Sequence, residues 1–179
     1  LSLYYLCYAK QPSFLSQGIS MSTVSIGQPV PNFNAMSTGD KNIQLSDYQG
    51  KYLVLYFYPK DNTPGCINEG QNFRDNTTQF EQLNTVILGV SRDSVRVHEG
   101  FKNKQSFPFD LLSDKEEILC ALFDVIKMKN MYGKQVRGIE RSTFLIAPDG
   151  RLIHEWRKVK VKTHVDEVLQ TLTELGESL

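Results

Sequence analysis

A cysteine stands where a predicted helix begins, directly after a loop of turn-forming residues. The loop covers residues 59–65, which follow an apolar run, and Cys66 comes next. A thiol attacks as its thiolate, and the unpaired N–H groups and positive dipole end of a helix N-terminus favour that form. Cys66 is therefore either a nucleophile or a buried structural cysteine, and its spacing alone favours neither.

Two residues of the loop could assist a reactive sulfur. Thr63 precedes Cys66 by three positions, so its hydroxyl could hydrogen-bond the sulfur or a bound oxygen. Pro59 stiffens the loop and could shield the sulfur from water. The alternative is that Thr63 only caps the helix.

Arg141 offers a charge that could act on the same sulfur. It directly precedes an expected strand at residues 142–146. If that strand neighbours the strand at residues 52–58, the guanidinium would reach the loop, favour a thiolate and bind a polar oxygen substrate. Without Cys66, Arg141 would be interpreted as a surface arginine paired with Glu140.

Expected strands and helices alternate along the chain before a hairpin and a last helix. β-forming apolar runs predict strands at residues 52–58, 86–91, 109–112, 142–146 and 151–157. Helical periodicity and start signals predict helices at residues 66–84, 94–105, about 113–123 and through the stripe Val165, Val168, Leu169, Leu172 and Leu175. We therefore expect an α/β fold with a mixed central β-sheet flanked by helices on both faces.

Shorter segments receive simpler predictions. Residues 26–33 are expected to form an entry loop leading to an edge strand, and residues 43–45 a second short strand. Residues 127–138 are polar and are expected to form an irregular, solvent-facing loop. Trp156 is assigned to sheet packing. His98, His154 and His164 lack metal-ligand spacing and are expected at the surface.

Composition limits the class of protein. The 179 residues contain 20 Lys and Arg and 20 Asp and Glu, so a nucleic-acid or membrane-surface partner is not expected. No run is long and apolar enough to span a bilayer. Three cysteines, an odd and sparse set, favour a reducing, cytoplasmic setting. Residues 1–20 are expected to be an extension outside the fold, with residues 21–179 as the domain.

The motifs around Cys66 resemble those of a known family. The spacing Pro59-x-x-x-Thr63-x-x-Cys66 is similar to the active-site motif of peroxiredoxins. Residues 57–66, with Phe73-Arg74-Asp75, and residues 138–146 resemble the bacterioferritin comigratory protein (BCP/PrxQ) subfamily. The resemblance runs from about Val24 to the C-terminus. It implies a thioredoxin-like fold and the reduction of hydrogen peroxide and organic hydroperoxides in antioxidant defence.

The resemblance also implies roles for single residues. Cys66 would be the peroxidatic nucleophile, Thr63 would hold the peroxide oxygens, and Pro59 would shield the thiolate. Arg141 would stabilise the thiolate and polarise the O–O bond. Glu69 matches an acidic position of the family and would orient the loop or Arg141, or serve only the helix dipole. The resemblance requires no metal and no organic cofactor.

The sequence differs from the subfamily at the position of the resolving cysteine, the second thiol that reacts with the oxidised first cysteine. Many members carry a resolving cysteine five positions after the first, where this chain has Gln71. Cys120 is the remaining internal candidate, but its apolar surroundings favour a core role, and Cys7 receives little weight. We therefore expect a 1-Cys-like cycle in a monomer, with thioredoxin, glutaredoxin or glutathione as reductant.

Two other classes of protein share these residues. A redox-regulated sensor or holdase would oxidise Cys66 without sustained turnover. A thioredoxin-like disulfide reductase is disfavoured, because Cys66 is followed by Ile67-Asn68-Glu69 and no C-x-x-C occurs.

Overall fold

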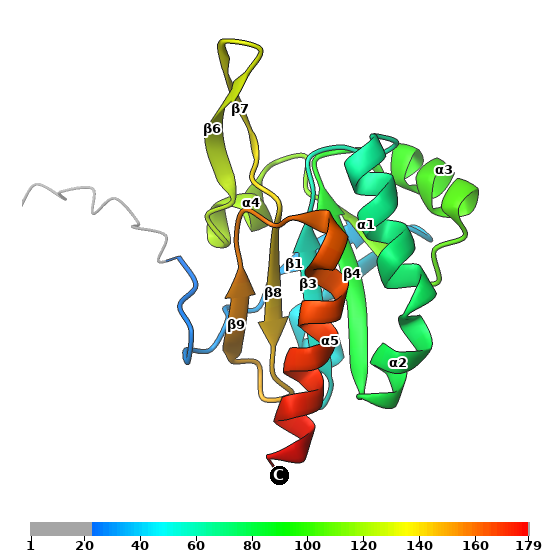
Figure 1. Ribbon diagram of the computed structural model, residues 1–179, viewed down its shortest axis with the longest axis vertical. Helices are drawn as coiled ribbons and strands as arrows, with labels where there is room; N and C mark the ends of the chain where they lie inside the picture. Colours follow the sequence, from blue (N-terminus) through cyan, green and yellow to red (C-terminus); the bar gives the residue numbers. More distant parts are fainter. Residues whose placement is uncertain (1–22, 179) are drawn as a thin grey trace, which may run out of the picture.

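A central seven-stranded sheet organises the chain (Figure 1). The computed structural model describes residues 23–178. The strand order is β2-β1-β5-β4-β3-β8-β9, with β3, β4 and β5 parallel and the other pairings antiparallel. The strands are β1 (Asn34–Ser37), β2 (Lys41–Gln44), β3 (Tyr52–Phe57), β4 (Thr85–Ser91), β5 (Asp110–Ser113), β8 (Ser142–Ile146) and β9 (Leu152–Trp156). The mixed sheet expected from the sequence is confirmed.

Strand β3 divides the core into two layers, because successive side chains of a strand point to opposite faces. Leu53, Leu55 and Phe57 enter one apolar cluster. Val54 and Tyr56 enter the other, together with Tyr58 just after the strand.

Helices cover the two faces unequally. The Tyr56 face carries four helices, which are α1 (Pro64–Asp75), α2 (Thr77–Gln82), α3 (Val95–Gln105) and α5 (Val161–Glu177). The Leu55 face carries the short helix α4 (Ile118–Leu122) and the 3-10 turn η1 (Leu45–Tyr48). Helices on both faces are therefore confirmed, and the thicker layer is the one that contains Cys66. None of the described helices is long and apolar enough to cross a membrane.

The helix expected at residues 66–84 is two helices that break at Asn76. The side-chain amide of Asn76 donates to the Asn72 carbonyl oxygen at 2.7 Å, and the Thr77 hydroxyl donates to the Phe73 carbonyl oxygen at 3.1 Å. Such side-chain bonds compete with the helical ladder and explain the break. Phe73 and Phe80 are both buried, so the apolar face predicted for this segment is present.

Helix α4 begins later than its start signal predicted. The helix was expected to start at Ser113-Asp114, but Glu117 has φ 57° and only residues 118–122 are helical. The carboxylate of Asp114 accepts the backbone N–H groups of Leu119 and Cys120 at 3.1 and 2.7 Å. The acidic residue therefore caps the helix from several residues upstream.

The expected irregular loop at residues 127–138 is instead a regular hairpin of two strands, β6 (Ile126–Met131) and β7 (Lys134–Ile139). Tyr132 and Gly133 form the turn with φ 53° and 79°, the left-handed pair that suits a two-residue hairpin connection. The hairpin forms its own two-stranded sheet and projects away from the body (Figure 1).

Residues 26–33 form the expected entry segment, but the strand that follows them is not at the edge of the sheet, because β2 lies outside it. Within residues 26–33 the only pairing is an isolated bridge between Pro29 and Arg151. The strand that pairs with β2 and β5 is β1, which follows directly.

Candidate functional site

Helix α1 begins after the loop that follows strand β3, and it places Cys66 against one face of the sheet. Thr63 occupies the N-cap position with an extended backbone, and its carbonyl oxygen accepts the first helical bond from Ile67 N at 2.8 Å. Pro64 follows at a position where proline's missing N–H is not needed. Cys66 lies in the first turn, only 2% exposed, next to the free N–H groups of the helix start.

Arg141 reaches the sulfur from strand β8. Phe57 pairs with Ser142, so β8 is antiparallel to β3 and Arg141 lies beside the β3–α1 loop, as expected from the sequence. Arg141 Nη2 lies 3.5 Å from Cys66 Sγ, and Nη1 donates to Glu69 Oε2. A Cβ at Gly65 would stand 3.1 Å from Arg141 Nη2, so the glycine leaves room for the guanidinium.

Glu69 holds the other side of Arg141 from one turn further along α1. It is fully buried, and its Oε1 atom and the Tyr56 hydroxyl are the buried side-chain polar atoms without a hydrogen-bond partner in the described part of the chain. Burial raises the pKa of Glu69 to about 7, and Arg141 opposes the rise. The carboxyl group is therefore a titratable partner of Arg141 near neutral pH.

We expect Glu69 to make the folded protein less stable as the pH rises from about 4.5 to about 7. The pKa of Glu69 is raised from 4.5 when the chain folds, so in this interval the folded state binds more protons than the unfolded state. The stabilising contribution is complete below the unfolded pKa and is lost as the pH rises through the folded one. Denaturant unfolding of wild type and Glu69→Gln at several pH values measures the effect. Equal pH slopes for the two proteins would contradict it.

Thr63 and Pro59 belong to the loop between β3 and Cys66, and both are half-buried. The Thr63 hydroxyl donates a hydrogen bond to the Lys60 carbonyl oxygen at 2.8 Å, and not to Cys66 Sγ. Its oxygen remains able to accept a hydrogen bond from a bound molecule. Pro59 lies two residues after the last residue of β3, beyond the end of the parallel pairing with β4.

Cys120 lies on the other face of the sheet. It is fully buried in the cluster of Leu55 and Phe57, whereas Cys66 packs in the cluster of Tyr56. Burial, together with Asp114, raises the pKa of the Cys120 thiol far above its ordinary value. Gln71, at the position of the missing resolving cysteine, donates from its amide to Gln105 Oε1 at 2.9 Å. Cys7 lies outside the described residues.

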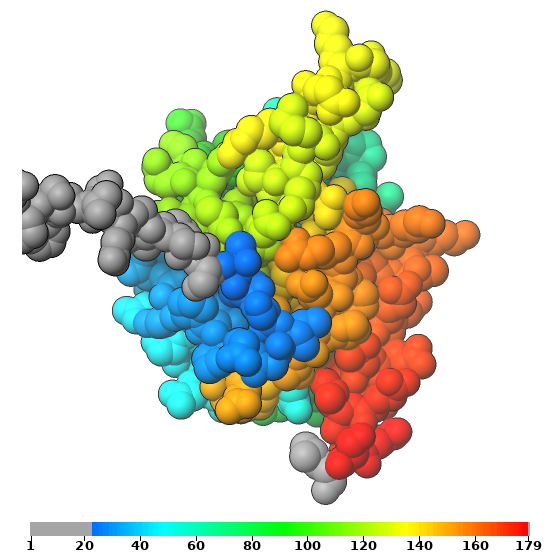
Figure 2. All heavy atoms as spheres, turned by 90° about the vertical axis from the view of Figure 1, so that its left-hand side faces the viewer, coloured from blue at the N-terminus to red at the C-terminus, as the bar shows by residue number. Residues whose placement is uncertain are grey.

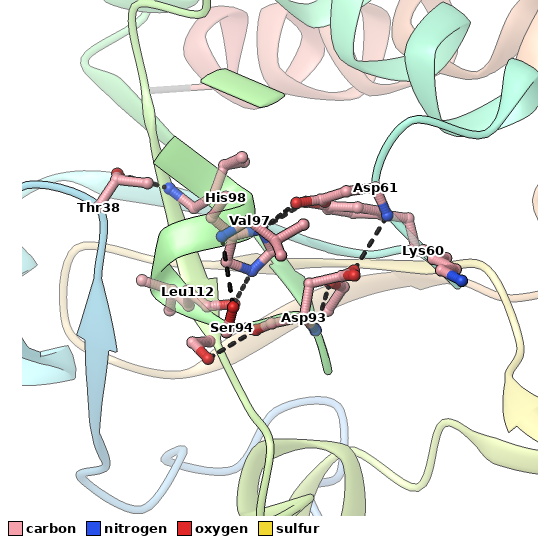
Figure 3. A network of polar contacts seen from close by, with 12 residues as sticks. Thr38, Lys60, Asp61, Asp93, Ser94, Val97, His98 and Leu112 are labelled. Atoms are coloured by element: carbon pink, nitrogen blue, oxygen red, sulfur yellow. Dashed lines mark hydrogen bonds and ion pairs between the residues drawn. The ribbon is translucent and has the colours of Figure 1, made fainter. Parts of the chain in front are cut away.

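A buried polar network fixes the loop that precedes Cys66 (Figure 3). Asp61 Oδ2 lies 2.6 Å from His98 Nδ1, and Asp61 Oδ1 accepts the Tyr58 hydroxyl at 2.6 Å. His98 Nε2 lies 2.9 Å from the Leu112 carbonyl oxygen and therefore carries a proton, because a carbonyl only accepts. The backbone N–H of Asp61 donates to Asp93 Oδ2 at 3.0 Å. The loop is thus tied to α3, β4 and β5.

The expectation that His98 and His164 are surface residues was wrong. His98 is fully buried in this network, and His164 is buried with its Nε2 atom 2.7 Å from the Thr143 hydroxyl. Burial lowers the pKa of His164 to about 4. Their partners come from distant elements, so no local pattern signalled the burial. Trp156 packs between His154 and His164, as its sheet-packing assignment predicted.

Asp61, Asp93 and His98 also present ligand-type atoms within 4.8 Å of one another. No local spacing indicated this cluster, because Asp61 and His98 are 37 positions apart in the sequence. These ligand atoms already hydrogen-bond within the network. The arrangement therefore positions the loop through hydrogen bonds.

We expect Asp61→Ala to lower the free energy of unfolding by about 1–3 kcal/mol for each of its two buried partners, because the Tyr58 hydroxyl and His98 Nδ1 lose their hydrogen bonds to Asp61. Asp61→Asn should cost much less, since an amide can accept the Tyr58 hydroxyl at its oxygen and donate an N–H to His98 Nδ1. Denaturant unfolding of both variants measures the difference. Equal losses of unfolding free energy in the two variants would show that the hydrogen bonds of Asp61 are not the source of its contribution to stability.

The comparison with known proteins agrees with this fold. A model of the AhpC/TSA family matches residues 26–155, and the chain belongs to that family. It is 54% identical to peroxiredoxin Bcp of Bacillus subtilis (strain 168) over 155 residues, which cover 87% of this chain and 99% of that protein. It is 55% identical to peroxiredoxin Bcp of Xanthomonas campestris pv. campestris over 135 residues, covering 75% of this chain and 84% of that protein.

Comparison with solved structures identifies the subfamily within the AhpC/TSA family. A cysteine-to-serine mutant of PrxQ from Xylella fastidiosa matches with a TM-score of 0.82 and 51% identity, over 87% of this chain and 99% of that chain. The Xanthomonas campestris bacterioferritin comigratory protein, studied for its alkyl peroxide reduction activity, matches with a TM-score of 0.76 and 51% identity, over 79% and 90%. The fold is thus thioredoxin-like, and the subfamily is Bcp/PrxQ. A member of this subfamily is a thiol peroxidase.

Proposed function

We propose that this peroxidase reduces hydrogen peroxide and alkyl hydroperoxides through Cys66, with an external thiol as the reductant. The observation that carries the proposal is the 3.5 Å contact between Arg141 Nη2 and Cys66 Sγ at the start of α1. Two sources of positive potential, the guanidinium and the helix N-terminus, meet at one sulfur. The alkyl substrates are proposed by analogy with the Xanthomonas relative.

The chemistry is a displacement at oxygen. The Cys66 thiolate attacks the terminal oxygen of the peroxide, an S–O bond forms as the O–O bond breaks, and the leaving oxygen departs with the electron pair. Protonation then gives water or an alcohol. Arg141 stabilises the charge that grows on the oxygens, and the Thr63 hydroxyl accepts a hydrogen bond from the peroxide O–H and so orients the peroxide. Pro59 limits water at the sulfur, and Glu69 holds Arg141 in place.

The sulfenic acid left on Cys66 is reduced from outside the chain. The separation of Cys66 and Cys120 on opposite faces of the sheet supports this 1-Cys-like cycle. A thiolate of the reductant attacks Sγ and water leaves, and a second thiol then releases Cys66 and forms a disulfide in the reductant. Thioredoxin, glutaredoxin and glutathione all fit this step.

Peroxide consumption with each of these three reductants in turn tests the proposal. We expect steady turnover with at least one of them, and mass spectrometry of the oxidised protein should detect oxidised Cys66 without a Cys66–Cys120 disulfide. Stoichiometric oxidation of Cys66 without turnover under any reductant would favour the sensor or holdase. A Cys66–Cys120 disulfide would overturn the 1-Cys cycle.

A further inference from the structure

The hairpin of β6 and β7 exposes apolar side chains away from any core. Figure 2 shows the hairpin, in yellow, standing clear of the rest of the surface. The exposed fractions are 62% for Met128, 50% for Met131, 101% for Tyr132 and 42% for Val136. Met and Tyr are enriched in the buried centres of protein interfaces. A projecting ribbon that carries them is typical of a contact surface.

The charge of the hairpin has one sign. Residues 126–139 include Lys127, Lys129, Lys134 and Arg137 and no acidic residue. Opposite residues of an antiparallel pair share a face, so Met131 pairs with Lys134 and Val136 with Lys129. Cations and apolar side chains therefore alternate along one face. Such a face is complementary to an apolar patch with an acidic rim.

The base of the hairpin is fixed next to the candidate site. Strand β7 ends at Ile139, two residues before Arg141, and Lys129 Nζ donates to the Ile139 carbonyl oxygen. Arg137 and Arg92 both bind the Glu117 carboxylate, which holds β7 to the body. A protein seated along the hairpin would therefore lie beside Cys66.

We propose that the β6–β7 hairpin is the docking surface for the protein that reduces Cys66, a dithiol redox protein with an acidic rim around its reactive cysteines. The proposal rests on the proposed function, because that cycle needs a thiol from another molecule. The hairpin would supply affinity, and the partner would carry out the thiol exchange described above. A second copy of this chain is a poorer occupant, since a symmetric contact between hairpins would bring like charges together.

The double variant Tyr132→Asn with Lys134→Glu tests the docking surface. Asparagine tolerates the left-handed backbone at position 132, and both side chains are exposed, so the fold is preserved. The matched control is Lys51→Glu, an exposed lysine before β3 at the opposite end of the sheet from Cys66. Peroxide consumption is followed with thioredoxin, with glutaredoxin and with dithiothreitol.

We expect the hairpin variant to raise the KM for the protein reductant about tenfold and to flatten its dependence on salt. Its rate with dithiothreitol, and every rate of Lys51→Glu, should match wild type. An unchanged KM for the protein reductant overturns the docking proposal, as does an equal loss with dithiothreitol.

Other outcomes separate the docking proposal from the proposed function. If dithiothreitol sustains turnover but neither redox protein does, the docking surface is wrong while the peroxidase cycle stands. If wild type fails with dithiothreitol as well, the cycle itself fails. A change in oligomeric state with an unchanged KM would assign the hairpin to a second copy and overturn the redox partner.

Discussion

Cys66→Ser is expected to reduce peroxide consumption to the uncatalysed rate under every reductant. A serine hydroxyl stays protonated near neutral pH, and the Arg141 contact and the helix N-terminus cannot make it a comparable nucleophile. The remaining groups would still bind peroxide but would have no atom that accepts its oxygen. The measurement is the second-order rate constant of peroxide loss, together with mass spectrometry of the protein after one equivalent of peroxide.

The matched control is Cys120→Ala. Cys120 is buried on the other face of the sheet, and its thiol pKa is raised by burial and by Asp114. We expect this variant to keep the wild-type rate within about twofold and to lose only stability, about 1–2 kcal/mol for the smaller core side chain. Wild-type turnover in Cys66→Ser, or its loss in Cys120→Ala, would contradict the assignment of the nucleophile.

Arg141→Lys is expected to slow the oxidation of Cys66 by about 10²-fold or more, which is the usual loss when a donor to a developing oxyanion is removed. The guanidinium contacts Cys66 and Glu69 with two different nitrogens, and a single ammonium cannot reproduce that fork. Keeping the positive charge makes the substitution a test of geometry more than of net charge. Stopped-flow oxidation of the reduced protein measures the rate.

The control for this variant is Arg151→Lys, at an exposed arginine in the turn before β9 whose partner is Asp149. It should leave the oxidation rate unchanged. An oxidation rate in Arg141→Lys within threefold of wild type would mean that any nearby cation suffices and that the fork is not needed.

Local signals were sufficient for most of the fold and for the composition of the site. The β-forming run at β3 and the helical spacing of Phe73 and Phe80 are short-range patterns, which can be recognised directly in the sequence. The neighbourhood of Arg141 and Cys66 followed once β8 was paired with β3. The pairing of β8 with β3 is the one long-range contact that this placement required, and the resemblance of both motifs to one subfamily supported it.

The predictions that were wrong depend on contacts between distant elements or on side-chain hydrogen bonds that compete with the helix. His98 is buried by Asp61 and Leu112, which lie in other elements. Only Ile126 and Ile139, at the base of the hairpin, pack against the core, so most of its residues carry no core-strand pattern. The usable signals were the short alternation of apolar and polar residues at 126–129 and the Tyr132-Gly133 turn. Helix breaking at Asn76 depends on side-chain bonds to the preceding turn, which propensity alone underestimates.

The placement of the two described cysteines on opposite faces of one sheet has a kinetic consequence for the proposed cycle. Because Cys120, the other cysteine within residues 23–178, is out of reach, it offers the oxidised sulfur no first-order route back. Its lifetime is then inversely proportional to the concentration of the reductant, while a second peroxide molecule competes to form the irreversible sulfinic acid. The fraction of protein that stays active would therefore record the ratio of reductant to peroxide that the molecule has experienced.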